Sequence, residues 1–216
     1  MSQQTIVIGD IHGCFDELRE LLDRVALASE DRVVSVGDLI VKGPKNREVL
    51  DMFIDHPRCF SAVIGNHDLA LRTHWQHKRS PLKPAQRRVR DELETDKKRY
   101  ASYLQSLPLL INLEKHLIVH AGIRPSVSLE KQSTEDLTEL RTLGPDRTSR
   151  DGPPWYEEYR GEKTVLFGHW PAAAPRRGPQ ALGIDTGCVY GYSLTAYIIE
   201  SDKLISVKAR RRYDAS

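Results

Sequence analysis

The sequence predicts an α/β fold in which two packed β-sheets are covered by helices. Apolar runs that end in glycine recur along the 216-residue chain, and the first, at 5–8, precedes a segment of helical periodicity at 15–25. In the second half, apolar runs follow one another with only short turns between them, which indicates sheet rather than helix. Strand–helix alternation followed by clustered strands is the pattern expected for such a layered fold.

The composition is typical of a soluble globular protein. Hydrophobic residues make up 39% of the chain, charged residues make up 29%, and the net charge is +2. No apolar run reaches the length of a membrane span, and the N-terminus has no signal-peptide pattern. Cys14, Cys59 and Cys188 are odd in number and widely spaced, which predicts free thiols in a reducing compartment. We therefore expect one cytoplasmic domain over residues 1–216, without a membrane partner.

The first half of the chain alternates strands with helices. Apolar residues recur at helical spacing over 15–25 and predict the first helix. A right-handed crossover should then place the strand predicted at 32–36 parallel to the first strand. Asn46 is the expected cap of a helix that runs to about His56, and another strand follows at 60–64.

A basic segment runs from residue 72 to residue 99. It holds ten lysines and arginines against four acids. Apolar residues at helical spacing predict an amphipathic helix from Ala85 to Leu107, so we expect a basic helical cap at about 72–107. Two interpretations of this cap remain open, namely a solvated helix face and a basic rim that attracts polyanionic substrates.

The second half predicts a run of strands. Residues 143–160 contain Gly-Pro and Gly-Pro-Pro and predict a loop or lid, and residues 171–180 predict a turn rich in proline and arginine. The short connections between strands favour antiparallel pairing. The predicted strands lie at 164–168, 181–185, 193–200 and 203–208.

Five apolar runs end next to side chains of the kinds that bind metal ions. In open α/β sheets, functional sites gather beyond the carboxyl ends of the strands. Oxygen and nitrogen donors without a thiolate favour Mn, Fe, Zn or Mg over a soft metal. Six donors exceed what one tetrahedral ion needs and fit two ions about 3.5–4 Å apart. In chain order, the candidate ligands are Asp10, His12, Asp38, Asn66, His120 and His169.

In this order, the motifs GDIHG, GDLIVKGP, GNHD, HAG and GHW resemble those of the calcineurin-like metallophosphoesterases. Within that superfamily the chain is similar to the branch of bacterial phosphoprotein phosphatases and symmetrical diadenosine tetraphosphate hydrolases. The motifs GNHDL, VHAGI, FGHW and IDTGC are closer to those of the hydrolases. The resemblance covers about residues 5–195 and implies a four-layer α-β-β-α sandwich of two mixed sheets with helices outside.

The resemblance also implies how two divalent metal ions, with Mn²⁺ expected, would be held. Asp38 would be the carboxylate that both ions share, and a metal-bridging hydroxide would attack phosphorus. His67 would act as the general acid or as an electrostatic partner of the leaving oxygen. The remaining ligands divide into Asp10 and His12 for one ion and Asn66, His120 and His169 for the other.

Two departures from the family pattern concern the phosphate-binding and orienting residues. The family's GDxxxRG arginine is Lys42 here, which supplies a point charge instead of a bidentate fork. Arg141 matches the place of the family's second phosphate-binding arginine approximately, so we expect Lys42 and Arg141 to share that role. Val41 replaces the aspartate that orients the corresponding histidine in many phosphoprotein phosphatases, which leaves the group that orients His67 open.

We therefore expect metal-dependent hydrolysis of phosphate esters or anhydrides, with nucleoside polyphosphates such as diadenosine tetraphosphate as the leading substrates. A serine/threonine phosphoprotein phosphatase with the same site is the alternative. A nuclease or nucleic-acid binder is disfavoured, because no aromatic residues interleave the basic runs. A non-catalytic metal-binding module is disfavoured by the complete donor set together with His67.

Overall fold

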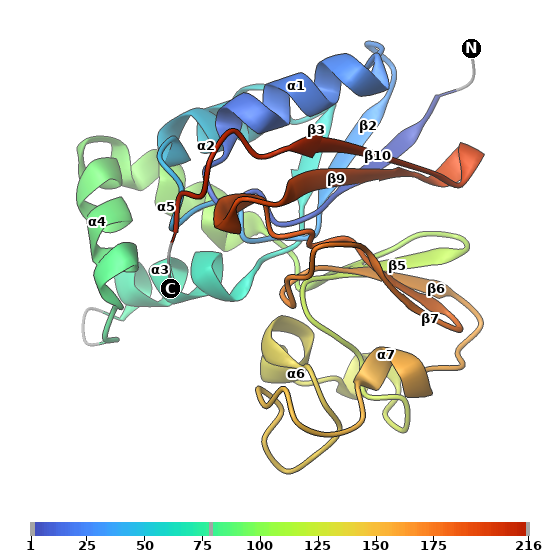
Figure 1. The fold of residues 1–216 in the computed structure, drawn as a ribbon. Coiled ribbons are helices and arrows are strands. Elements are labelled where there is room, and N and C mark those ends of the chain that lie inside the picture. The colour runs from blue at the N-terminus through green and yellow to red at the C-terminus, as the bar shows by residue number, and fades with distance from the viewer. Residues whose placement is uncertain (1–2, 78–79, 215–216) are drawn as a thin grey trace.

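The structure is a computed structural model that describes residues 3–77 and 80–214. Two five-stranded sheets pack against each other, and helices cover their outer faces (Figure 1). The predicted α/β class and the sandwich of two mixed sheets are confirmed. Lys78 and Arg79, two cations of the basic segment, lie outside the described residues, as do the first two and last two residues of the expected domain.

The first sheet joins the beginning of the chain to its end. Its strand order is β10-β9-β1-β2-β3. As predicted, β2 is parallel to β1; β3 is parallel to β2, and β9 and β10 form an antiparallel pair beside β1. The strands are β1 (Thr5–Ile8), β2 (Arg32–Ser35), β3 (Phe60–Ala62), β9 (Ser193–Ile198) and β10 (Lys203–Lys208).

The second sheet has the order β4-β5-β6-β8-β7. Its strands are β4 (Leu110–Asn112), β5 (His116–Val119), β6 (Thr164–Phe167), β7 (Arg176–Gly178) and β8 (Ala181–Gly183). The antiparallel pairing expected between the strands at 164–168 and 181–185 is wrong, because β6 and β8 are parallel. The reason is that part of the predicted turn at 171–180 forms edge strand β7. A hairpin from β7 into β8 then reverses the chain, so that β8 returns in the direction of β6.

Helices cover the two sheets unequally. In Figure 1, α1 and α2 lie over the first sheet, whereas α6 and α7 lie beside the second. The α-helices are α1 (Phe15–Val25), α2 (Asn46–Asp55), α3 (Asn66–Gln76), α4 (Pro84–Leu93), α5 (Lys97–Ser106), α6 (Thr134–Glu139) and α7 (Trp155–Glu158). Four short 3₁₀ helices complete the described elements, namely η1 (Glu94–Asp96), η2 (Leu129–Lys131), η3 (Cys188–Tyr190) and η4 (Ile199–Ser201).

Successive residues of the central strands point into different layers. In β1, Ile6 and Ile8 pack under the helices, whereas Val7 points into the space between the sheets. In β6, Leu166 shares that space with Val7, while Phe167 packs on the opposite side, against α7. Strands that are buried on both faces need apolar residues at every position, which explains the continuous apolar runs of the sequence.

Two helix predictions need correction. Asn46 is the first residue of α2 and not its cap, and its Oδ1 accepts a hydrogen bond from the Val41 N–H at 2.8 Å. The single helix expected over 85–107 is divided into α4 and α5 by η1. The Glu-Thr-Asp sequence of η1 has no buried side chain, so nothing continues the apolar stripe between the buried Leu93 of α4 and Tyr100 of α5.

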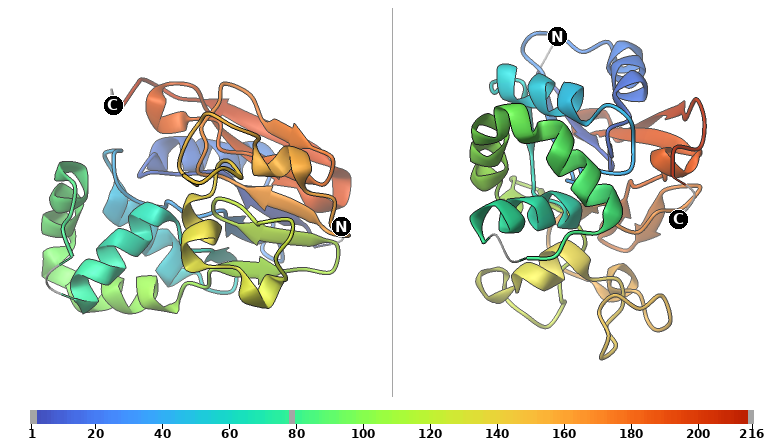
Figure 2. Two further views of the ribbon diagram at one scale, coloured as in Figure 1. Left: turned by 90° about the horizontal axis from the view of Figure 1, so that it is seen from below. Right: turned by 90° about the vertical axis from the view of Figure 1, so that its left-hand side faces the viewer.

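Helix α3 has no counterpart in the sequence prediction. Only Asp68 and Leu71 of this helix are buried, so its sequence has no apolar stripe. Its position is set by other helices instead, because α4 and α5 both pack against it. Figure 2 shows α3, α4 and α5 together on one side of the sheets. We call α4 and α5 the cap helices.

Trp155 anchors the segment that the sequence predicted as a loop or lid at 143–160. The ring is fully buried, lies 4.9 Å from the Phe167 ring between centroids, and donates a hydrogen bond from Nε1 to the Ala121 carbonyl at 3.1 Å. A Cβ on Gly122 would lie 2.6 Å from that Nε1, so the glycine of the HAG motif is needed to admit the ring. The C-terminal end of this segment is therefore anchored in the core by the Trp155 ring.

None of the described helices combines the length and the apolar character needed to cross a membrane.

We expect Trp155→Ala to lower the free energy of unfolding by about 3–5 kcal/mol, because it removes a buried aromatic ring and leaves a cavity. Urea denaturation monitored by circular dichroism measures the change. Tyr192, which is 51% exposed, provides the control. Tyr192→Ala should change the free energy by less than about 0.5 kcal/mol. Equal destabilisation by the two substitutions would contradict the role of Trp155 as an anchor.

Candidate metal centre

The six candidate ligands follow the carboxyl ends of strands from both sheets. Three of the strands, β1, β2 and β3, belong to the first sheet, and two, β5 and β6, belong to the second. The structure brings all six side chains together, although the most distant pair is separated by 159 positions in the sequence. Asp10 and His12 follow β1, Asp38 follows β2, Asn66 follows β3, His120 follows β5 and His169 follows β6.

The donor atoms of these residues lie at the spacing of atoms around a shared ion. Asn66 Oδ1 is 3.0 Å from His120 Nε2 and 3.1 Å from His169 Nδ1. Asp38 Oδ2 is 3.5 Å from the Nε2 atoms of both His12 and His120. Metal–ligand bonds of about 2.0–2.2 Å put neighbouring donors about 3–3.5 Å apart. The Asp38 carboxylate therefore lies between the histidines of the two sheets.

Burial sets the protonation of these groups. It raises the pKa of Asp38 to about 7 and lowers the pKa of His120 to about 4. Burial also lowers the pKa values of His12 and His169, so these imidazoles are neutral, which is the form that binds metals. His169 Nε2 is buried and has no hydrogen-bond partner among the described residues. Neutral imidazoles offer free nitrogen lone pairs, and the buried carboxylates carry negative charge that divalent cations would balance.

Backbone strain is concentrated at this centre. Among the described non-glycine residues, seven have a positive φ, and five of these belong to the centre or to the loop beside it. The other two, Ala26 and Asp202, directly follow helical segments. Left-handed conformations of ordinary residues cost about 1–3 kcal/mol each and cluster at functional sites. The five are His12 (48°), Asp38 (49°), Val41 (77°), Lys42 (75°) and His169 (65°).

Two glycines make room for the carboxylates. A Cβ on Gly65 would overlap the backbone nitrogen and the carboxylate of Asp38. A Cβ on Gly168 would overlap the carboxylate of Asp10, which instead accepts the His169 backbone N–H at 3.1 Å. The glycines of the GNHD and GHW motifs are thus required by the close approach of backbone and ligand.

Asp68 supports the centre and was not among the site residues predicted from the sequence. This fully buried carboxylate accepts backbone N–H groups of Gly65 at 3.1 Å and Leu39 at 3.3 Å. It thereby ties the loop after β2 to the start of α3, and so fixes Asp38 relative to Asn66. Its place in the GNHD motif was the only signal for it. Burial raises the pKa of Asp68 to about 7, and a buried carboxylate needs hydrogen-bond donors such as these two backbone groups.

Asp185 was missed as well. It follows β8 in the IDTGC motif, lines the same cleft, and accepts the Gly187 N–H at 3.0 Å. Burial is the main cause that raises the pKa of Asp10 well above its usual value, and the charge of Asp185 is the next. The centre therefore has more buried negative charge than the six candidate ligands account for.

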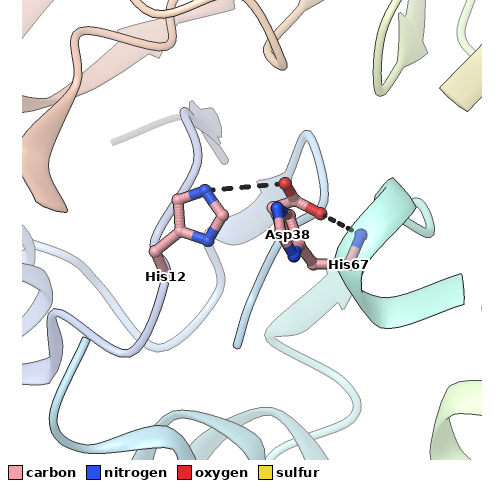
Figure 3. Close-up of side chains that lie close together, drawn as sticks. All are labelled: His12, Asp38 and His67. Atoms are coloured by element: carbon pink, nitrogen blue, oxygen red, sulfur yellow. Dashed lines mark hydrogen bonds and ion pairs between the residues drawn. The ribbon is translucent and has the colours of Figure 1, made fainter. Parts of the chain in front are cut away.

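His67 stands beside the candidate ligands. Its backbone N–H donates to Asp38 Oδ1 at 2.9 Å, and its ring meets the His12 ring edge-on at 5.3 Å between centroids. Figure 3 shows His12, Asp38 and His67 grouped in this way. Burial is the main cause that lowers the pKa of His67, and the charge of Lys42 adds to it.

Gln86, on cap helix α4, contacts the His67 ring. Gln86 Nε2 lies 3.4 Å from His67 Nδ1, and Gln86 Oε1 accepts the Lys83 backbone N–H at 2.8 Å. Because that backbone group can only donate, it fixes the amide so that Nε2 faces the imidazole. Nδ1 must then accept, and the ring proton lies on Nε2. Gln86 thus makes the kind of contact that Val41, which is buried in the core, does not make.

Lys42 and Arg141 line the cleft with these residues. Lys42 Nζ donates to the Tyr190 hydroxyl at 2.7 Å and lies 3.3 Å from His12 Nε2. Burial lowers the pKa of Lys42, but Asp38, Tyr190 and Asp10 together outweigh this and the net pKa is raised, so the ammonium stays charged. Arg141 donates from Nη1 to the Thr148 carbonyl, while its buried Nε has no hydrogen-bond partner in the part of the chain that the structure describes.

The cleft above the centre has a volume of about 580 Å³. All the predicted site residues except His120 line it, and His120 is fully buried. Residues from the cap helices and from the segment before Trp155 complete its wall, including Lys83, Arg88 and Arg150. A cleft of this size can hold a substrate larger than a phosphate monoester.

The chain is similar in sequence to several known proteins over nearly its whole length. The chain is 30% identical to proteins named symmetrical bis(5'-nucleosyl)-tetraphosphatase from Vibrio parahaemolyticus and Serratia proteamaculans. These alignments cover 95% and 96% of this chain and 98% and 95% of the relatives. They run over 265 and 271 positions, more than the 216 residues of this chain, so the relatives contain insertions.

The fold is also similar to a crystal structure provisionally described as a diadenosine tetraphosphatase. The TM-score is 0.85 and the identity 30%, over 97% of this chain and 95% of the other. Residues 4–200 match the family described as calcineurin-like phosphoesterase. With nearly the whole chain matched and oxygen and nitrogen donors gathered at five strand ends, the protein belongs to the calcineurin-like phosphoesterases, a family of metal-dependent hydrolases.

Proposed function

We propose that this protein hydrolyses nucleoside polyphosphates, with diadenosine tetraphosphate as the leading substrate. The observation that carries the proposal is the convergence of the six donors from five strand ends under one cleft lined with cations. Relatives named as tetraphosphatases, aligned over nearly their whole length, support the choice of substrate. A single domain with a basic helical cap is the proposed catalytic unit. The proposed location is the cytoplasm, which the three free thiols support.

The proposed cofactor is a pair of Mn²⁺ ions, with Fe, Zn or Mg as alternatives. When bound, such ions would polarise phosphate oxygens and make water a better nucleophile at neutral pH. Asp38 is the proposed shared ligand, since its carboxylate lies between His12 and His120. The other proposed ligands are Asp10, Asn66 and His169.

The chain's own residues would bind the substrate and supply a proton. Lys42 is proposed to hold a phosphate oxygen, because its charged ammonium is fixed at the edge of the centre by Tyr190. Arg141 would act from the opposite wall. His67 would present its Nε2–H to the leaving oxygen, as an electrostatic partner while the ring is neutral and as the general acid once the ring is protonated, with Gln86 as the positioning residue.

A serine/threonine phosphoprotein phosphatase would use the same donors, and it remains the alternative. The cleft argues for the polyphosphate, because four cationic residues at its wall, Lys83, Arg88, Arg141 and Arg150, exceed what one phosphate monoester requires. Nucleic acid is not a proposed partner.

Chelation should abolish hydrolysis of diadenosine tetraphosphate, and Mn²⁺ should restore it. Elemental analysis should find up to two ions per chain. Asp38→Asn should reduce activity more than Asn66→Asp, because only the former removes a charge that both ions would share. A panel with a phosphoseryl peptide and a nitrophenyl monoester, each with Mn²⁺ and Mg²⁺, tests the substrate. Full activity after exhaustive chelation would refute the metal proposal, and preference for the peptide would favour the alternative function.

Lys42→Ala should raise KM and lower kcat for every phosphate substrate, by about tenfold or more in kcat/KM, since a charge-assisted hydrogen bond is lost. Lys42→Arg should preserve binding, because the charge remains and a fork is added. Steady-state kinetics with the tetraphosphate provide the measurement. Unchanged parameters in Lys42→Ala would shift the phosphate-binding role to Arg141.

His67→Asn should slow hydrolysis of an alkyl phosphate by about 10²–10⁴-fold, and that of a nitrophenyl phosphate much less, because only the alkoxide needs a proton to leave. Gln86→Leu should act in the same direction with a smaller effect, because the imidazole is kept but its tautomer is no longer fixed. Metal content should stay unchanged in both variants. Equal losses on the two substrates would instead indicate stabilisation of charge, and loss of metal would make His67 a structural residue of the centre.

A further inference from the structure

Four cations at the wall of the cleft lie in two separate segments of the chain. Lys83 directly precedes cap helix α4 and Arg88 lies in its middle, whereas the half-buried Arg141 and the exposed Arg150 belong to the segment between α6 and α7. The two walls flank different histidines of the centre. The charge of Lys83 helps to lower the pKa of His67, and the charge of Arg141 helps to lower the pKa of His169.

The cations of the cleft differ from other cations of the same helices in their partners. Arg90 of α4 pairs with Asp91 at 2.6 Å, and Arg99 of α5 pairs with Asp55 at 2.7 Å. By contrast, Lys83, Arg88 and Arg150 form no ion pair with any residue in 3–77 or 80–214. Lys83, Arg88 and Arg150 therefore bring positive charge to the cleft that no described carboxylate neutralises.

The acids of the cleft are less exposed than Lys83 and Arg88. Of the four described acids that line the cleft, Asp10, Asp38 and Asp185 are buried at its floor and Asp214 is half-buried, whereas Lys83 and Arg88 are exposed at its rim. Divalent cations would neutralise the floor, so a bound anion would meet positive charge in the centre and on both sides of it.

We propose that a phosphate chain crosses the metal centre, with the phosphates on one side of the scissile bond bound by Lys83 and Arg88 and those on the other side bound by Arg141 and Arg150. This inference rests on the proposed function and makes it more specific. A substrate with phosphates on both sides of the scissile bond uses both walls. A terminal monoester uses neither wall fully, so the cleft selects for cleavage inside a polyphosphate chain.

The test compares the double variant Lys83→Ala/Arg88→Ala with Arg90→Ala, a control on the same helix whose cation has its own acidic partner. In the double variant, KM for diadenosine tetraphosphate should rise by about tenfold, as two exposed cation–phosphate contacts allow. KM for nitrophenyl phosphate should change by less than about twofold. The rise of the tetraphosphate KM with added salt should also become shallower, since fewer charges are left to screen.

A second measurement separates this inference from the proposed function. Inorganic tripolyphosphate is used as a competitive inhibitor of nitrophenyl phosphate hydrolysis, and its inhibition constant should rise by about tenfold in the double variant but not in Arg90→Ala. If the protein did not cleave the tetraphosphate but showed this difference, the proposed substrate would be wrong and the subsite would stand. An unchanged inhibition constant, or an equal rise in Arg90→Ala, would overturn the subsite.

Discussion

The buried carboxylate of Asp38 is the group on which the rest of the site depends. It lies where the two sheets meet, with Oδ2 3.5 Å from a histidine of each sheet and Oδ1 holding the backbone N–H of His67 at 2.9 Å. Burial raises its pKa to about 7, so its charge is costly in the absence of a cation. A centre of this kind requires both sheets to be in place, because neither sheet supplies enough donors alone.

The surrounding structure compensates for that cost with rigid supports. Asp68 ties the loop after β2 to the start of α3, and Gly65 leaves space for the Asp38 carboxylate. On the other sheet, Trp155 packs against the face of β6 that points away from the first sheet. Its backbone N–H donates to the Arg141 carbonyl at 3.1 Å and so holds the segment that carries Arg141. Rigid elements of this kind can keep His12 and Asp38 in left-handed conformations that isolated residues avoid.

Charge is distributed by depth in this molecule. Buried acids lie in the centre, a charged lysine, Lys42, stands at its edge, and exposed cations line the rim. This order suits a polyanion that approaches through the rim and delivers one phosphate to the centre. In the basic cap, Lys83 and Arg88 line the cleft and form no ion pair with a described residue, whereas Arg99, away from the cleft, is paired with Asp51 and Asp55.

The sequence by itself determined the features that depend on neighbours along the chain. Buried strands appear as continuous apolar runs, α1 spans 15–25 as its periodicity predicted, and each candidate ligand lies one to four residues past a strand end. The tertiary structure alone decided the parallel pairing of β6 with β8, the division of the cap at η1, and the contact of Gln86 with His67 across 19 positions. The physical reason is that periodicity and turn chemistry act over a few residues. Which strand becomes a neighbour, and which side chain reaches a ring, is set instead by packing between segments that are distant in the sequence.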